Sequence, residues 1–319
     1  MKAILDKKSN DFFAKNFDKI EGDLNKCSLL KAFDNSFKSL KPNSMKILEF
    51  LNVLTESIES VSLSVLVSVF EKIHYIIGYF VSNEDYKSYK KAIFNKLYSR
   101  IKTETCSETV PLLLDTIIDF AKDSEDIQTL KNWYHSKDEV LSKYPLTLIK
   151  KWRITFLVHA STSFTDEQKK EMFDEVFNND TTDLKIEYQT KIQGLIADDA
   201  QRQEIINKLL SKDSELNLNY VHHMGAGFNS RHVSIEKRMK FHDLFFKSVP
   251  EIVSVRSTEI AKYILIFLCP LSDCDLEGTI NKLKEMKGAV NSDLFLMKKI
   301  IQNKIEHYDE IFQIKSAKA

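Results

Sequence analysis

The chain contains very few of the residues that interrupt regular secondary structure: seven glycines and five prolines in 319 residues. Parallel-sheet nucleotide folds and β-sandwiches usually need more of them, because tight turns between strands depend on glycine, proline and similar residues. The long stretches between them are amphipathic here, and 43% of all residues are hydrophobic, enough for a sizeable core. This pattern favours a folded, helical chain.

The segment 146–160 shows helical periodicity clearly. Ile149, Trp152 and Phe156 recur at the spacing of one helix face. Pro145 suits the first turn of this helix, where its missing N–H costs nothing. The pattern therefore predicts a helix that begins near Pro145 and buries Trp152.

Polar residues and prolines mark the ends of further predicted helices. Thr165, followed three residues later by Gln168, has the spacing of a capping box. Pro250 is predicted to open a helix that Pro270 ends. The segment 61–70 alternates like a strand, but its apolar residues also continue a helical stripe, and we interpret it as helix.

Helices of about 10–20 residues joined by short polar links are typical of helical-repeat proteins. We therefore predict an all-α fold, a HEAT- or armadillo-like right-handed solenoid of antiparallel helix pairs. No exact sequence repeat is visible, so we expect a period in the structure alone. Residues 1–27 are charged and weakly periodic and are predicted to form a loose segment or a marginal helix, whereas 28–319 form the helical-repeat domain.

The charge balance gives no long-range attraction to nucleic acid or to an anionic membrane. Lys and Arg total 46, and Asp and Glu also total 46. The most apolar segment, 61–81, is broken by Glu71, Lys72 and His74, so it favours a buried helix over a membrane span. We predict neither nucleic acid nor a membrane as a partner.

The cysteines and the N-terminus together favour the cytoplasm. Cys27, Cys106, Cys269 and Cys274 are spaced like neither a zinc knuckle nor a redox motif, and free thiols are typical of a reducing compartment. The apolar stretch 3–5 is too short for the core of a signal peptide. Cytoplasmic localisation is the resulting prediction.

No familiar catalytic motif occurs in the sequence. The His-Glu-x-x-His pattern of zinc peptidases is absent, and Glu306-His307 has no second histidine nearby. A phosphate-binding Gly-x-x-x-x-Gly-Lys-Ser/Thr loop and a Gly-x-Ser-x-Gly elbow are also absent. The two glycines of MGAGF at 224–228 are interpreted as a helix cap followed by a turn. We assign no catalytic residue.

The densest histidine cluster comprises His222, His223, His232 and His242. A metal site is one interpretation, but adjacent histidines on a helix diverge by about 100°. No carboxylate or cysteine stands three or four residues from two of them. We therefore interpret them as histidines of the helix surface or core edge, and predict no metal ligand.

Several other residues have both a functional and a structural interpretation. Phe241, Phe245 and Phe246 recur at helical spacing and are interpreted as core rather than as a cofactor site. Asp180 and Asp183 resemble a carboxylate pair, but they flank threonines at a predicted helix start. Capping is the interpretation we prefer for both.

Five stretches, in order, resemble a known family. They are LTESIESVSLSVLVSVFEKIHYIIGYF with Glu56, LIKKWRIT, FNNDTTDLKIEYQTKIQGLIAD, GAGFNSRHVSIEKRMKFHDLFFKSVPEIVSVRSTEIAKYILIFLCP, and KKIIQNKIEHYDEIFQI. The fourth is the most specific, with a Gly-Phe turn, an aromatic-rich helix, a Pro-x-Ile link and a helix that closes on proline. Together they resemble the C-terminal helical domain of aminopeptidase-N-type zinc aminopeptidases, from about residue 30 to the end. Cys269 departs from the family, which usually has an aromatic residue before that proline.

The resemblance implies a structural role in peptide hydrolysis. In that family a thermolysin-like catalytic domain holds the zinc, and the helical domain roofs the active-site chamber and restricts access to short peptides. The expected partners are such a catalytic domain, in cis or in trans, and a peptide substrate. No cofactor is expected in this chain, because its zinc motif and the exopeptidase Gly-Ala-Met-Glu-Asn motif are both absent; zinc would belong to the catalytic domain.

Two functions remain open at this point. In the first, the chain is the C-terminal helical domain of a zinc aminopeptidase that shapes peptide access for removal of N-terminal residues and is not catalytic alone. Arg231, His232 and Arg256, near inter-helix turns, would then face bound peptide, although solvent-exposed charges are the alternative. In the second, the chain is a free-standing helical-repeat scaffold that binds proteins.

Overall fold

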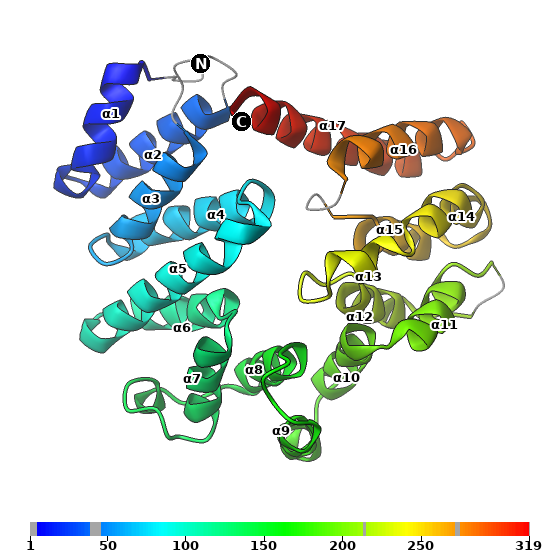
Figure 1. The fold of residues 1–319 in the computed structure, drawn as a ribbon, viewed down its shortest axis with the longest axis horizontal. Coiled ribbons are helices and arrows are strands. Elements are labelled where there is room, and N and C mark those ends of the chain that lie inside the picture. The colour runs from blue at the N-terminus through cyan, green and yellow to red at the C-terminus, as the bar shows by residue number, and fades with distance from the viewer. Residues whose placement is uncertain (1–4, 39–45, 213–214, 272–274, 319) are drawn as a thin grey trace. The chain divides into compact units, whose positions relative to one another are not determined.

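The computed structural model describes residues 5–38, 46–212, 215–271 and 275–318, and these residues form helices and connecting loops without a β-strand (Figure 1). The predicted all-α class is confirmed. The helices are α1 (Lys7–Asn16), η1 (Phe17–Lys19), α2 (Asp23–Lys38), α3 (Ile47–Ser57), α4 (Leu63–Tyr79), α5 (Asn83–Thr103), α6 (Thr109–Phe120), α7 (Ser124–Tyr134), η2 (Leu141–Lys143), α8 (Leu148–Ala160), α9 (Asp166–Asn179), α10 (Leu184–Ile196), α11 (Asp199–Leu209), α12 (Leu218–Phe228), α13 (Ile235–Met239), α14 (His242–Val255), α15 (Thr258–Phe267), α16 (Leu276–Ala289) and α17 (Phe295–Lys318).

Helix starts follow the capping chemistry of the sequence. The backbone N–H of Gln168 donates to Thr165 Oγ1 at 3.3 Å, and the N–H of Thr165 donates to Gln168 Oε1 at 3.0 Å, so the predicted capping box is confirmed. Asp198 and Gln201 form a second box at α11. The ambiguous segment 61–70 lies largely in α4, which confirms the helical interpretation.

Two proline predictions are wrong. Pro145 lies before α8, whose N-cap is Thr147. Pro250 does not open a helix but lies inside α14, where the buried Val249 and Ile252 continue the apolar face past it. Burial of that face offsets the cost of the lost backbone hydrogen bond. The single helix expected up to Pro270 is instead divided, because Ser257 caps a new helix, α15, through a bond from the backbone of Ile260.

The glycines of MGAGF do not end a helix as predicted; Gly225 and Gly227 lie within α12. A Cβ at Gly227 would stand 1.9 Å from the carbonyl oxygen of Lys191 on α10. A Cβ at Gly194 on α10 would in turn stand 2.6 Å from the carbonyl oxygen of Met224. Glycine is therefore needed here because the backbones of α10 and α12 touch, and not for its turn conformations.

The N-terminal region, for which the sequence predicts a loose segment or a marginal helix, contains α1, η1 and the start of α2. Asp6 caps α1 by accepting from the backbone of Ser9, and α1 contacts α3. Phe17 and Phe33 are buried with their ring centroids 6.5 Å apart. Helix α2 already begins at Asp23, before the expected boundary at residue 28. The first helices thus contribute apolar side chains to the core.

The chain divides into two compact units: unit 1 comprises 1–146 and 311–319, and unit 2 comprises 147–310. The sequence prediction of one domain over 28–319 did not include this division. Within each unit, several helices contact the next helix but one: α1 with α3, α3 with α5 and α2 with α4 in unit 1, and α8 with α10, α10 with α12 and α14 with α16 in unit 2. Successive helices, such as α5 with α6 and α8 with α9, also pack together. Each unit therefore combines contacts between successive helices with contacts between alternate helices.

Several polar contacts in both units join segments about 40 residues apart. The separations are 40 residues for Lys96 with Glu56, 40 for Tyr98 with Asp138, 41 for Lys240 with Asp199, 40 for Asn229 with the carbonyl of Cys269 and 38 for Tyr308 with the carbonyl of Pro270. Other polar contacts span shorter separations, 35 residues for Lys91 with Asp126 and 28 for Trp152 with Asp180, so the separation is not uniform.

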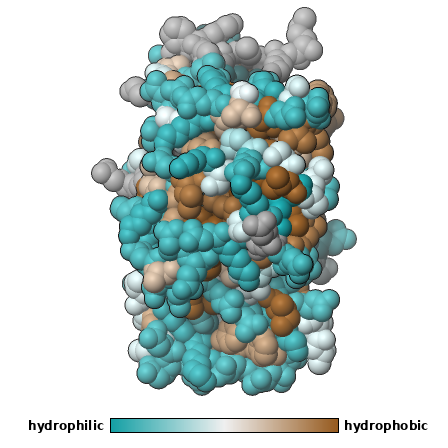
Figure 2. Space-filling model, turned by 90° about the vertical axis from the view of Figure 1, so that its right-hand side faces the viewer, coloured by the Kyte–Doolittle hydropathy of each residue, from teal (hydrophilic) through white to brown (hydrophobic). Residues whose placement is uncertain are grey.

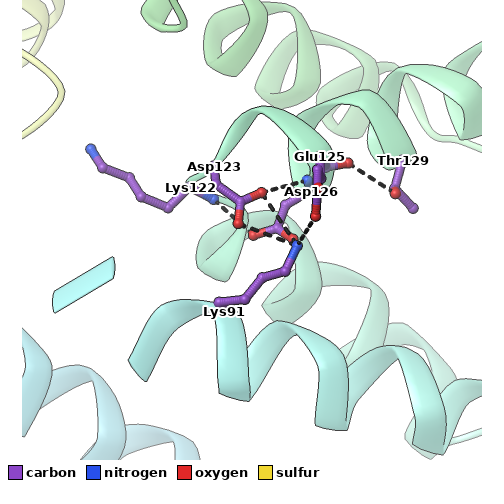
Figure 3. A network of polar contacts seen from close by, with 6 residues as sticks. All are labelled: Lys91, Lys122, Asp123, Glu125, Asp126 and Thr129. Atoms are coloured by element: carbon purple, nitrogen blue, oxygen red, sulfur yellow. Dashed lines mark hydrogen bonds and ion pairs between the residues drawn. The ribbon is translucent and has the colours of Figure 1, made fainter. Parts of the chain in front are cut away.

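A buried carboxylate joins α5 to α7 in unit 1 (Figure 3). Lys91 Nζ lies 2.8 Å from Asp126 Oδ1, 3.0 Å from Glu125 Oε2 and 3.2 Å from Asp123 Oδ2. The Asp126 side chain is fully buried, and burial raises its pKa against the opposing effect of Lys91. Burial also disfavours the Lys91 ammonium, but its three carboxylate partners outweigh that effect and raise its pKa. Lys91 therefore stays charged and stabilises the start of α7.

In the part of the chain that the structure describes, no helix combines the length and apolar character needed to cross a bilayer.

Candidate peptide-binding groove

A groove of about 940 Å³ lies within unit 2. It is lined by the end of α8 and the residues that follow it, by α9, by the second half of α10 and by 232–237 at the start of α13. Three stretches that are separated in the sequence, 159–174, 189–196 and 232–237, therefore form one concavity. A volume of this size lies within the range of ligand-binding pockets, about 300–1,000 Å³.

The floor of the groove is the surface of a hydrophobic cluster. Its buried members are Trp152, Phe156, Val176, Ile192, Leu195 and Val233, with Phe173 and Tyr188 among the side chains packed against them. The Trp152 ring stacks on Tyr188 at a centroid distance of 5.5 Å and meets Phe173 edge to face at 5.7 Å. The prediction that Trp152 is a core residue is confirmed, and it supports the floor from below.

Asp180 fixes the position of Trp152. Trp152 Nε1 donates to Asp180 Oδ2 at 2.7 Å, and the backbone N–H and hydroxyl of Thr182 donate to Oδ1 at 2.6 and 2.7 Å. Burial favours the neutral acid, but these donors outweigh it and lower the pKa of Asp180. Asp180 thus joins α8 to the α9–α10 link, a larger role than the predicted capping. Asp183 occupies the N-cap position of α10 without a side-chain cap bond.

The rim carries more positive than negative charge. Lys170 pairs with Asp174 at 2.6 Å, and Asp166 lies in the first turn of α9, where a carboxylate is favoured by the helix dipole. Lys169 on α9 and Lys237 on α13 make no ion pair within the described residues. The rim therefore presents two positive charges, on Lys169 and Lys237, with which an anionic ligand can pair.

The groove also contains two histidines. His159 Nδ1 donates to the carbonyl of Thr155 at 2.9 Å, and burial lowers the pKa of His159, with a further contribution from Lys169. His159 is therefore neutral at pH 7, and its Nε2 is left as an acceptor. His232 contacts the Phe156 ring edge to face at 5.9 Å.

Of the residues expected to face a peptide, His232 lines the groove. Arg231 is half-buried beside it and has interactions of its own. Arg256 follows α14 in an extended conformation, and its buried Nε and Nη2 have no hydrogen-bond partner among the described residues. The structure thus brings His232, but neither arginine, to the groove wall.

The four histidines that are close together in the sequence lie at different places in the fold. His222 and His223 are neighbours on α12 with ring centroids 4.3 Å apart, and His223 Nε2 lies 3.7 Å from Glu187 Oε2. His232 lines the groove and His242 is buried at the start of α14. Over the described ranges, no three histidine, cysteine or acidic side chains are grouped so as to hold a metal ion.

Apolar exposure elsewhere is scattered. Figure 2 shows one side of the molecule, on which apolar patches are interrupted by hydrophilic residues. Val255 and Phe295 are 55% and 74% exposed, but isolated apolar side chains are normal on protein surfaces. The groove differs because its exposed Ile196, at 55%, continues into a buried apolar cluster.

Sequence reasoning missed Phe173, Lys169 and Lys237. Phe173 and Phe177 stand four residues apart on α9, a spacing that signals an apolar face. No local pattern pairs Lys169 with Lys237, because only the fold brings their segments together.

Comparison with protein-family models finds no match to the chain, and a search of curated proteins finds none either.

Proposed function

We propose that this chain is a helical-repeat protein that binds peptide segments in the groove of unit 2. Its architecture in this proposal is a HEAT- or armadillo-like right-handed solenoid of antiparallel helix pairs. Support comes from the contacts of several helices with the next helix but one and from the subset of polar contacts at separations near 40 residues. HEAT and armadillo repeats have periods of about 40–47 residues.

The observation that carries the proposal is the groove itself. An apolar floor continuous with the core removes side chains from water, and polar groups at the rim orient a ligand. The floor belongs to a cluster in which Trp152 stacks on Tyr188, so its apolar side chains are already packed without a ligand. A preformed site saves the cost of ordering these side chains on binding.

The biological context follows from the family resemblance. The chain acts as the C-terminal helical domain of a zinc aminopeptidase, roofing the active-site chamber in cis or in trans without catalysis of its own. Zinc belongs to the catalytic domain. The proposed cytoplasmic location is supported by Cys27, Cys106 and Cys269, which form no disulfide; Cys274 lies outside the described residues.

Affinity capture from the native source, followed by mass spectrometry, tests this context. Recovery of a thermolysin-like zinc aminopeptidase is the expected result. Recovery of other proteins, with binding that depends on the groove, favours the free-standing scaffold instead.

Peptide binding is tested with two substitutions on the same helix. Ile196→Arg places a charge at the groove, whereas Ile186→Arg is the matched control on α10, at a site outside the groove that is 52% exposed. Peptides selected from a displayed library against the full chain should bind the control like the original chain and lose at least about tenfold in affinity on Ile196→Arg. Equal binding to both variants contradicts groove binding.

A further inference from the structure

We infer that the groove selects acidic peptide segments that carry a bulky apolar side chain. This rests on the proposed function and specifies its ligand class. The charge and shape of the groove carry the inference, together with two of its lysines that form no ion pair with any residue the structure describes.

The charges that line the groove do not cancel one another. Lys170 and Asp174 form their own ion pair, which leaves Lys169, Lys237 and Asp166. Asp166 has the N-terminus of α9 beside it, where backbone N–H groups favour a carboxylate. Lys169 and Lys237 have no carboxylate within ion-pair distance in the described residues, although Asp199 lies near enough to Lys237 for each to influence the other's charge.

The two lysines belong to different elements. Lys169 is half-buried on α9 and Lys237 is exposed on α13. A ligand that contacts both must reach from one wall of the groove to another. An extended segment with carboxylates on more than one residue satisfies this requirement, because it offers an acceptor to each lysine.

The floor between these elements accepts an apolar side chain. Ile192, Leu195 and Val233 are buried there, and Phe173 and Ile196 present further apolar surface. His159 is neutral because burial lowers its pKa, so it adds no charge to the floor. A large aliphatic or aromatic side chain therefore gains burial, and its neighbours in sequence reach the lysines.

The experiment uses the full chain and three fluorescein-labelled peptides of equal length. All three carry the same central Leu-Phe pair, flanked by glutamates, by glutamines or by lysines. Anisotropy titrations are run at about 0.05 M and 0.5 M NaCl, since screening weakens contacts between exposed charges. The variants are Lys169→Glu/Lys237→Glu and the control Lys247→Glu, an exposed lysine of α14 outside the groove.

The acidic peptide should bind tightest at low salt, by about tenfold over the neutral peptide, and the advantage should shrink at high salt. Lys169→Glu/Lys237→Glu should remove the preference for acidic flanks, and Lys247→Glu should leave it unchanged. Equal affinity for all three peptides, still lost on Ile196→Arg, overturns the charge selectivity and leaves the proposed function intact. Tightest binding of the lysine-flanked peptide also overturns it. Failure of every peptide to bind removes both proposals.

Discussion

Gly227→Ala should destabilise unit 2, whereas Gly288→Ala should stabilise it. Both positions are helical, so alanine brings the same favourable change in helix propensity to each, about 0.5–1 kcal/mol. Their surroundings differ. A Cβ at Gly227 meets the Lys191 carbonyl oxygen at 1.9 Å, and a Cβ at Gly288 meets nothing within 4 Å.

The magnitude follows from what can move. The group that the new Cβ at Gly227 would meet is backbone of α10, which cannot rotate away as a side chain can. The two helices must therefore move apart by roughly 1.5 Å to restore an ordinary van der Waals separation of about 3.5 Å. Overpacking of this kind costs about 1–3 kcal/mol or more, and a backbone clash lies at the upper end. We expect a net loss of about 3 kcal/mol for Gly227→Ala and a gain of about 0.5 kcal/mol for Gly288→Ala.

Thermal unfolding followed by circular dichroism measures both changes. For a unit of this size, 1 kcal/mol shifts the melting temperature by about 2–4 °C. Gly227→Ala should therefore lower it by about 6–12 °C and Gly288→Ala should raise it by about 1–2 °C. Gly194→Ala, whose Cβ would stand 2.6 Å from the Met224 carbonyl, should also lower it. Equal shifts for Gly227→Ala and Gly288→Ala would refute the close approach of α10 and α12.

Two further predictions concern buried carboxylates. Asp180→Asn should cost about 2 kcal/mol at pH 7, because one oxygen that accepts from Trp152 or Thr182 is replaced by a donor. Because the pKa of Asp180 is lowered in the folded state, its stabilisation is complete above about pH 4 and is lost as the pH falls through the folded-state pKa. Urea unfolding should therefore show a smaller difference in stability between Asp180→Asn and the original chain at pH 3 than at pH 7. The same difference at both pH values would argue against an ionised Asp180. Lys91→Met should cost about 2 kcal/mol or more of stability, because Asp126 is left buried without its cation. The control Lys96→Met removes only contacts to exposed carboxylates and should cost less than about 1 kcal/mol. Equal losses in urea unfolding would show that Asp126 does not depend on Lys91.

Features set by short stretches of sequence were predictable. Trp152 and Phe156 of the predicted stripe are buried in α8, although Ile149, its third member, is 46% exposed. The Thr165–Gln168 box fixes the start of α9. Both depend on residues within one or two turns of one another. The same local physics gave the all-α class, since amphipathic periodicity and sparse turn residues act along each segment separately.

Features set by contacts between distant segments were not predictable. Glycine within MGAGF has the same local propensity whether it ends a helix or allows a close crossing, and only the position of Lys191 decides for Gly227. Pro250 likewise suits a helix start locally, but the apolar face of α14 continues past it. Propensity was overruled by tertiary packing at both positions.

The residues of the candidate site also fall into one that local sequence indicated and others that only the packing of distant segments brings to the groove. His232 was identified because it lies near a turn, where ligand-binding residues are common. Its neighbours in the groove, Lys169 and Phe173, come from another helix, and their role depends on how α9 packs against α8 and the start of α13. Arg256 was chosen on the same grounds as His232 but lies elsewhere in unit 2, at the end of α14.

Peptide binding in the groove of unit 2 is tested most directly by amide hydrogen exchange, followed by mass spectrometry, of the full chain with and without saturating glutamate-flanked Leu-Phe peptide. Binding should slow exchange in 159–174, 189–196 and 232–237, the segments that line the groove, and leave α4 and α5 unchanged. Unchanged exchange in these three segments, with protection elsewhere in the chain, would contradict a peptide site in the groove.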